Sequence, residues 1–181
     1  MVCILLAEGF EESEAIIPAD LLRRAGAEVA LTSLTGVEVT GSHGITVKAD
    51  RTLAEISAEE LDMLVIPGGM GGVESIRTDL FAADLIRKVY DRKIYLAAIC
   101  AGPTVLGGMG LLDGRTAVCY PGMEPELGSA NAQIGMPVVM DGFLITGEAA
   151  GSAFAFGLKL VEVLKGSAAA EQVRHAVHYH S

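Results

Sequence analysis

Short apolar runs recur along the chain and predict the strands of a buried sheet. Val2–Ala7 and Ile94–Ile99 are both continuously apolar and are too short for a buried helix. Runs of this kind are typical of strands that are covered on both faces. Three further segments are expected to be strands because apolar residues alternate or dominate in them: Glu28–Leu34, Asp62–Ile66 and Arg115–Tyr120.

Helices are expected where apolar residues recur at steps of three and four. The expected helices are Glu11–Ala25, Asp79–Arg92, Ala153–Lys165 and Ala168–His178, with shorter helical pieces at Leu53–Leu61 and from Pro103 to Leu106. Pro18 lies inside the first helix, which predicts either a kink or a helix that begins late. The glycine-rich segment Pro67–Gly72 is expected to be a loop, and Met123–Pro137 shows no clear pattern.

Two segments predict antiparallel pairs of strands. Thr35–Asp50 contains short β-like runs between glycines, so small strands or a hairpin are expected there, outside the main sheet. Val138–Met140 and Phe143–Thr146 are expected to pair across the turn Asp141-Gly142.

Strands alternate with helices along the chain, which predicts an α/β fold with a parallel sheet and helices on both faces. One domain over residues 1–181 is expected, because no linker, repeat or low-complexity tract divides the chain. In such folds, sites lie beyond the carboxyl ends of the strands. Three loops follow predicted strands, at Glu8–Glu14, Gly68–Gly72 and Cys100–Pro103, and we expect them to converge.

Composition narrows the classes of protein to consider. Of the 181 residues, 51% are apolar and 20% are charged, which is typical of a compact protein. The formal net charge of −10, with no cluster of Lys and Arg, argues against binding to nucleic acid or to an anionic membrane. The odd number of cysteines, three, favours a reducing cytoplasm over a secreted disulfide framework. No signal peptide or membrane span is expected, because no apolar stretch is long enough.

Cys100 is the first candidate for chemistry, because it stands where a predicted strand turns sharply into a helix. Gly102 and Pro103 supply the tight turn and the first helical residue. Such a turn lifts a side chain off the sheet edge and aims backbone amides at the same place. A helix N-terminus also favours negative charge, so a reactive thiolate is expected. The alternative is a buried structural cysteine.

Glu14, near the start of the first predicted helix, is the candidate partner of Cys100. Two like charges in a partly dry pocket disfavour each other, so one of the two groups must hold a proton. A protonated Glu14 could donate to the sulfur and also serve as an acid and base. The alternative is an ordinary first-turn carboxylate. Gly68 and Gly69 offer backbone amides that, with the amide of Ala101, could form an oxyanion hole.

Other motifs are weak or missing. Gly69–Glu74 has a glutamate where a dinucleotide motif needs its third glycine, and no phosphate-binding Gly-Lys-Ser/Thr occurs. Three of the four histidines fall in the last seven residues: His175, His178 and His180. A frayed C-terminal tail is a simpler interpretation of this segment than a metal site. No two cysteines have zinc-ligand spacing, so a structural zinc site is not expected. No metal and no other cofactor is predicted. Tyr120 could present its phenol to the pocket or cover the core.

Taken together, these residues resemble the ThiJ/PfpI superfamily, in its parkinsonism-associated deglycase branch (DJ-one-like proteins), over nearly the whole length. The blocks that carry the resemblance are Ala7–Glu14, Ile17–Asp20, Arg23–Gly26, Val65–Gly69 and Ala97–Pro103. The resemblance implies a flavodoxin-like three-layer sandwich and a homodimer. It also implies that Cys100 is the nucleophile, that Glu14 is its protonated partner, and that the amides of Gly69 and Ala101 hold an oxyanion.

The resemblance also covers the border of the pocket, where some residues differ from the family's. Of two arginines that border the family's pocket, one corresponds to Arg24. The other corresponds less closely to His43, which replaces it. The family's pocket histidine aligns with Tyr120, which makes a Cys–His dyad doubtful. The family's Gly-Pro-Gly-Thr segment is replaced by Ala149–Ser152, so Ala150 is expected at the pocket rim.

Three functions remain open. The first is a cofactor-independent glyoxalase or deglycase in which Cys100 adds to small dicarbonyls, converting methylglyoxal to lactate. The second is a redox sensor or redox-gated chaperone that uses the sulfinic acid of Cys100. The third, a cysteine amidase or peptidase, ranks last because it needs a histidine near the sulfur.

Overall fold

The computed structural model describes residues 1–180 and is built around a seven-stranded sheet. In spatial order the strands are β10 (Val138–Asp141), β11 (Leu144–Gly147), β7 (Tyr95–Ile99), β6 (Met63–Ile66), β1 (Val2–Leu6), β2 (Val29–Ser33) and β5 (Arg51–Thr52). Neighbouring strands pair in parallel except β10 and β11, which form the predicted antiparallel hairpin. The predicted α/β class with a mostly parallel sheet is confirmed.

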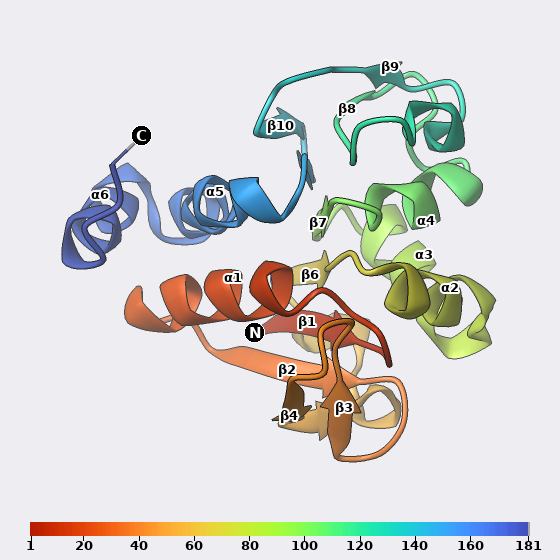
Figure 1. The fold of residues 1–181 in the computed structure, drawn as a ribbon, viewed down its shortest axis with the longest axis horizontal. Coiled ribbons are helices and arrows are strands. Elements are labelled where there is room, and N and C mark those ends of the chain that lie inside the picture. The colour runs from red at the N-terminus through yellow and green to blue at the C-terminus, as the bar shows by residue number, and fades with distance from the viewer. Residues whose placement is uncertain (181) are drawn as a thin grey trace.

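Helices cover both faces of this sheet (Figure 1). They are α1 (Glu12–Arg24), α2 (Met70–Thr78), α3 (Leu80–Asp91), α4 (Pro103–Gly108), α5 (Ala153–Lys165) and α6 (Ser167–Ala176). Helices α1, α5 and α6 pack on one face, and α2, α3 and α4 pack on the other. The arrangement is the predicted three-layer sandwich.

The central strands β1, β6, β7 and β11 each contribute to two separate apolar cores, because successive side chains of a strand point to opposite faces. In β1, Cys3 and Leu5 join the core under α2–α4, whereas Val2, Ile4 and Leu6 join the core under α1, α5 and α6. Burial on both faces explains why the strand segments in the middle of the sheet are continuously apolar.

Two small pairs of strands lie outside the main sheet. Strands β3 (Glu38–Thr40) and β4 (Thr46–Lys48) form an antiparallel hairpin, as predicted. Strands β8 (Thr116–Ala117) and β9 (Asn131–Ala132) pair in parallel. The remaining elements are 3-10 turns at Leu53–Glu55, Ala58–Glu60, Glu124–Leu127 and Ala150–Ser152. The helical piece predicted at Leu53–Leu61 is therefore two separate turns.

One predicted strand is shorter in the structure. The strand predicted at Arg115–Tyr120 shortens to β8, because the amides beyond it bond elsewhere: Val118 N–H donates to Thr146 Oγ1 at 2.9 Å, and Tyr120 N–H donates to the Cys100 carbonyl at 2.9 Å. Of the two outcomes predicted for Pro18, a kink or a late helix start, the late start does not occur, because α1 begins at Glu12 and contains Pro18.

Helix α2 was predicted as a loop because two glycines stand in its first turn. A Cβ atom on Gly71 would lie 3.1 Å from the Glu8 carbonyl oxygen, and one on Gly72 would lie 3.0 Å from Phe10 Cα. Glycine is therefore required at both positions, because the loop after β1 passes so close to α2 that a side chain would not fit. The two glycines do not mark a turn in the chain.

A third glycine fixes the packing of α1 on α5. A Cβ atom on Gly157 would lie 2.7 Å from Leu21 Cδ1 and 3.1 Å from Pro18 Cα, so the two helices approach at a point with no room for a side chain. This contact holds the helix that carries Glu14. Among residues 1–180, no helix combines the length and the apolar character that crossing a membrane requires.

Candidate active site

The three loops that were expected to converge do meet at one edge of the sheet. Gly68 N–H, after β6, donates to Glu14 Oε2 in α1 at 2.8 Å. Glu11 N–H donates to the Gly68 carbonyl at 2.9 Å, which ties the loop after β1 to the loop after β6. Cys100, after β7, lies beside both of them. The convergence follows from the parallel order of β7, β6 and β1, whose carboxyl ends share this edge.

Cys100 occupies a strained turn between β7 and α4. Its φ angle is +64°, in the left-handed region that residues with a side chain rarely adopt. The next turn residue, Gly102, is tightly confined, because a Cβ atom there would lie 2.5 Å from the Ile66 carbonyl oxygen and 2.9 Å from that of Ile99. The backbone therefore holds the sulfur in a fixed direction at the end of the sheet. Strain of this kind is common at functional sites.

Gly68 is the reason that Glu14 and Cys100 can approach each other. A Cβ atom on Gly68 would lie 2.5 Å from Glu14 Oε2, 2.8 Å from Cys100 Cβ and 3.1 Å from Ala101 N. The two side chains therefore flank the position that any other residue would fill. The predicted partnership of Glu14 with Cys100 is possible only because this residue has no side chain.

Glu14 is fully buried, and its carboxyl group has few hydrogen-bond partners. Its Oε2 accepts from Gly68 N–H, but its Oε1 has no hydrogen-bond partner among residues 1–180. Burial raises the pKa of Glu14 from its usual 4.5 to about 7, against the smaller lowering effects of Cys100 and the Gly68 amide. A carboxyl group with this pKa can accept or release a proton near neutral pH.

The expectation of a lowered thiol pKa is not met. Burial, followed by the charge of the adjacent Glu14 carboxylate, raises the pKa of Cys100 above its usual range, although the Ala101 amide acts in the opposite direction. Helix α4 is only six residues long, so its dipole offers little compensation. Because burial opposes charge on both groups, the pair carries at most one negative charge at neutral pH.

A cavity of about 660 Å³ opens over Cys100. Its wall includes the predicted residues Glu14, His43, Gly69, Cys100, Ala101, Tyr120 and Ala150, together with Glu11, Met70, Met123, Ala149 and Gly151. Sequence reasoning missed Met70 and Met123 because it assigned no element to either. Met70 begins α2, and its exposed side chain stands over the cavity mouth.

The amides predicted for an oxyanion hole stand at this cavity. Neither Gly69 N–H nor Ala101 N–H donates to a backbone carbonyl among residues 1–180. Gly69 has a φ angle of +87°, which only glycine adopts easily. The Gly68 amide, in contrast, is already used by Glu14. Both residues line the cavity, and the oxyanion role of their amides stays a prediction.

The other two cysteines do not line the cavity. Cys3 is 0% exposed and Cys119 is 3% exposed, whereas Cys100 is partly exposed. Cys119 packs into the core under α2–α4, while its neighbour Tyr120 is half exposed and lines the cavity. The chain thus turns the Tyr120 ring toward the site and the Cys119 thiol away from it.

In the single chain Arg24 does not line the cavity, so its place at the pocket border stays a prediction. It is the last residue of α1, and its Nε donates to Asp20 Oδ2 at 2.7 Å on the surface. The cavity lies at the opposite end of this helix, around Glu14. The pairing with Asp20 follows from their spacing of four residues, which puts both side chains on one face of the helix.

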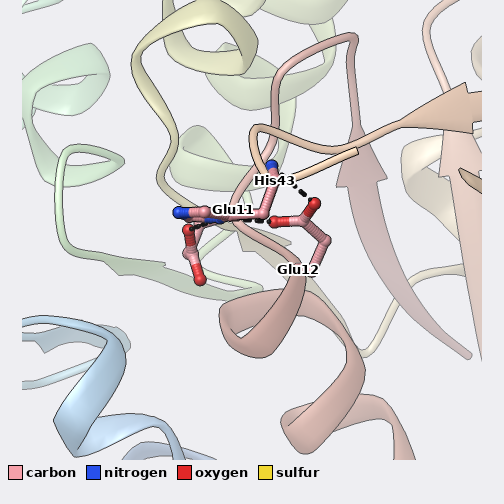
Figure 2. Close-up of side chains that lie close together, drawn as sticks. All are labelled: Glu11, Glu12 and His43. Atoms are coloured by element: carbon pink, nitrogen blue, oxygen red, sulfur yellow. Dashed lines mark hydrogen bonds and ion pairs between the residues drawn. The ribbon is translucent and has the colours of Figure 1, made fainter. Parts of the chain in front are cut away.

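His43 reaches the cavity from the loop between β3 and β4, where it meets two glutamates (Figure 2). Its Nδ1 lies 3.0 Å from Glu12 Oε2 and 3.2 Å from Glu11 Oε2. The interaction with Glu12 raises the pKa of His43. Among the described residues, no other histidine lines the cavity. The polar contacts of His43 within residues 1–180 are with the two glutamates and Ser42, and none of them is with Cys100.

Glu12 is also buried but differs from Glu14 in its partners. Its Oε1 accepts from His43 N–H at 2.8 Å and from Ile45 N–H at 3.3 Å. Although burial opposes ionisation, His43 and these amides lower the pKa of Glu12 to about 2. Gly41 makes room for this side chain, because a Cβ atom there would lie 2.3 Å from Glu12 Cδ.

Comparison with known proteins supports the resemblance. The family described as "DJ-1/PfpI family" matches residues 1–163. Protein dj-1beta of Drosophila melanogaster is 38% identical over 172 residues, which cover 94% of this chain and 92% of that protein. The deglycase PfpI of Pyrococcus furiosus is 34% identical over 165 residues, 91% of this chain and 99% of that protein.

Solved structures of DJ-1 proteins superpose closely on this chain. The crystal structure of Drosophila melanogaster DJ-1beta superposes with a TM-score of 0.95 at 36% identity and covers 99% of this chain and 98% of its own. The structure described as Toxoplasma gondii DJ-1, oxidized, superposes with a TM-score of 0.93 at 34% identity, covering 99% and 98% of the two chains.

Proposed function

This chain belongs to the DJ-1/PfpI family, and from that premise we propose that it is a cysteine-dependent glyoxalase or deglycase. Its substrates would be small reactive dicarbonyls, or the adducts that they form with proteins. The observation that carries the proposal is the juxtaposition of Cys100 with the buried Glu14, both at a cavity large enough for a three-carbon compound. Relatives that are named deglycases support the same class of activity.

The proposed reaction begins with addition of the sulfur to an aldehyde carbon. Glu14 as carboxylate accepts the thiol proton while the S–C bond forms, and the electron pair of the C=O bond moves to the oxygen. The amides of Gly69 and Ala101 stabilise the negative charge on that oxygen until it is protonated. This assignment suits a thiol with a raised pKa, because the proton leaves the sulfur only as the new bond forms.

In the second stage Glu14 moves a proton between adjacent carbons. It removes the proton from the carbon attached to sulfur and returns one to the neighbouring carbon, which converts the hemithioacetal of methylglyoxal into a thioester of lactate. Water then cleaves the thioester, which releases lactate and restores the thiol. No electron acceptor is needed, because one carbon is oxidised while its neighbour is reduced.

The test is lactate production from methylglyoxal by wild type, Cys100→Ser and Cys119→Ser. We expect Cys100→Ser to lose on the order of 100-fold or more of the turnover, since it removes the nucleophile. Cys119→Ser is the matched control, because Cys119 lies outside the cavity and its Sγ donates only to the adjacent Tyr120 carbonyl. Equal turnover by wild type and Cys100→Ser would remove Cys100 from the mechanism.

A redox-sensing role, including a redox-gated chaperone, is the second candidate. Cys100 is the one cysteine of the three that reaches the cavity, so oxidation should begin there. One similar solved structure is described as oxidized. After mild peroxide, intact-mass and peptide analysis should find two added oxygen atoms confined to Cys100. Equal oxidation of Cys3 and Cys119 would count against a sensor.

We also propose that the enzyme is a homodimer with one catalytic domain per chain and acts in the cytoplasm, as the family resemblance implies. Sedimentation of the purified protein tests the dimer directly. A monomer at all concentrations would contradict it.

A further inference from the structure

Four polar atoms from two distant segments surround one point beside the Cys100 cavity. Glu11 and Glu12 stand at the start of α1, and His43 stands in the loop between β3 and β4 (Figure 2). Ser42 precedes His43 in the same loop. His43 Nδ1 lies 3.0 Å from Glu12 Oε2 and 3.2 Å from Glu11 Oε2. Ser42 Oγ lies 3.1 Å from the same nitrogen, and 3.2 Å and 3.4 Å from the Glu11 and Glu12 oxygens.

Hydrogen bonds alone do not account for these contacts. The carboxylates of Glu11 and Glu12 are acceptors, so protons can come only from Ser42 Oγ and His43 Nδ1. Each of those atoms carries at most one hydrogen, whatever the protonation state of the imidazole. Five close contacts therefore share two protons, which leaves lone pairs facing one another near the common centre. A cation at that centre would attract all four atoms at once.

The spacing of the four atoms matches the coordination of a small transition-metal ion. Oxygen and nitrogen ligands of tetrahedral zinc lie about 2.0–2.2 Å from the metal, which corresponds to about 3.3–3.6 Å between neighbouring ligands. The contacts of 3.0–3.4 Å around His43 and Ser42 approach this range. Ligand atoms of Glu11, Glu12 and His43 all lie within 4.8 Å of one another.

The surrounding structure positions these ligands before any ion arrives. Gly41 leaves the space into which Glu12 fits. The amides of His43 and Ile45 hold Glu12 Oε1, so Oε2 is the oxygen turned to the centre. Among residues 1–180, neither Glu11 nor Glu12 forms an ion pair with a lysine or arginine. A buried carboxylate such as that of Glu12 normally has a cationic partner or binds a metal, and among residues 1–180 the His43 imidazole is the only side chain that can pair with it as a cation.

We propose that Glu11, Glu12 and His43, with Ser42 as a fourth oxygen ligand, bind a divalent transition-metal ion such as Zn²⁺. Carboxylate, imidazole and hydroxyl ligands suit zinc and its neighbours in the first row better than a soft monovalent ion. From the sequence no metal is expected and His43 is placed only at the pocket border, because residues 11–12 and 42–43 meet only in the folded chain. The site does not depend on the proposed catalytic activity, since neither Cys100 nor Glu14 is among its ligands.

Calorimetric titration of the metal-free full chain with ZnCl2 tests the site. We expect one ion to bind to the wild type, and His43→Gln and Glu11→Gln each to weaken that binding at least about 10-fold, because each removes one ligand. The His43 side chain is 71% exposed, so His43→Gln should fold normally. His175→Gln is the matched control, since His175 also pairs with a glutamate, Glu171, at 2.8 Å but with no second acid.

Cys100→Ser separates this site from zinc binding at the reactive thiol. If Zn²⁺ binding survives Cys100→Ser and His175→Gln but weakens in His43→Gln and Glu11→Gln, the assignment holds. If Zn²⁺ fails to bind to the wild type, or if binding is equal in His43→Gln, the proposal is overturned. Loss of binding only in Cys100→Ser would assign the ion to the sulfur and would equally overturn it.

Discussion

The pKa values of two buried glutamates in the first turn of α1, Glu12 and Glu14, are shifted in opposite directions. Glu12 faces the β3–β4 loop, where amides and an imidazole surround it, and its pKa is lowered to about 2. Glu14 faces Cys100 with a single amide on one oxygen and no partner on the other, and its pKa is raised to about 7. The number of donors that the fold supplies decides the charge of each carboxyl group, since burial acts on both in the same direction.

This contrast separates a structural carboxylate from a reactive one. Glu12 fastens the loop that carries His43, because the amides of His43 and Ile45 donate to its Oε1. Glu14 is left unsatisfied beside a sulfur, and that makes it a usable base near neutral pH. Each depends on a glycine, Gly41 and Gly68 respectively, that leaves room for the carboxyl group.

The largest difference between the two glutamates is expected when the glycine beside each is replaced by alanine. The two variants are Gly68→Ala, beside Glu14, and Gly41→Ala, beside Glu12. A methyl group on Gly68 collides with both Glu14 Oε2 and Cys100 Cβ, so we expect turnover of methylglyoxal to fall on the order of 100-fold or more. Gly41→Ala displaces Glu12 alone and should change turnover far less. Steady-state kinetics on both variants, with circular dichroism as the check of folding, measures this. Equal losses would show that the two carboxylates are not independent.

Glu14→Gln should change how stability depends on pH. Since the folded pKa of Glu14, about 7, exceeds its usual 4.5, the folded state binds more protons between these values. The contribution of Glu14 is therefore complete below pH 4.5 and is lost as pH rises through 7, a difference of about 3 kcal/mol in the free energy of unfolding. Urea unfolding at pH 4.5 and pH 8 should show this loss in wild type and not in Glu14→Gln. Parallel pH curves would contradict it.

Glu12→Gln should have the opposite pH signature. Its folded pKa lies below the usual 4.5, so its contribution is present above that value and is lost as pH falls toward 2. At pH 7 the substitution should cost roughly 2 kcal/mol, because a buried acceptor of several amides loses its charge. Urea unfolding at pH 7 and pH 3 measures the difference. A larger cost at pH 3 than at pH 7 would reverse the assignment.

Arg24→Ala should have the smallest effect. The exposed pair with Asp20 contributes about 0.3–0.5 kcal/mol, and the residue lies at the far end of α1 from Cys100. Turnover should remain within about twofold of wild type, a change of less than 0.5 kcal/mol in the barrier. A marked loss of activity would mean that a second copy of the chain brings its own Arg24 to the cavity.

Much of the fold could be predicted from the sequence, because strands buried on both faces leave little choice of pattern. The runs Val2–Ala7 and Ile94–Ile99 became β1 and β7 for this reason. Helix α2 was missed because Gly71 and Gly72 were interpreted as local turn signals. Their cause is a contact with Glu8 and Phe10, and such close approaches between distant segments leave no local pattern.

The residues of the candidate site could be predicted from the sequence, but the shifts of their pKa values could not. The elbow at Cys100 and the nearness of Glu14 follow from strand order and local motif. The raised pKa of Cys100 depends on burial and on the adjacent carboxylate, which three-dimensional packing alone determines. Glu12 was not singled out at all, because a first-turn glutamate is common in helices and only the β3–β4 loop distinguishes this one.

The tight contact between Gly157 and Pro18 makes α1 sensitive to events far from the cavity. Pro18 follows Glu14 by one helical turn, so a methyl group added to Gly157 would push directly on the segment that carries the base. Damage to turnover would thus originate at the buried contact of α5 with α1, among residues that never touch a substrate. A survey of inactivating substitutions in this chain would need to look along that helix as well as around the sulfur.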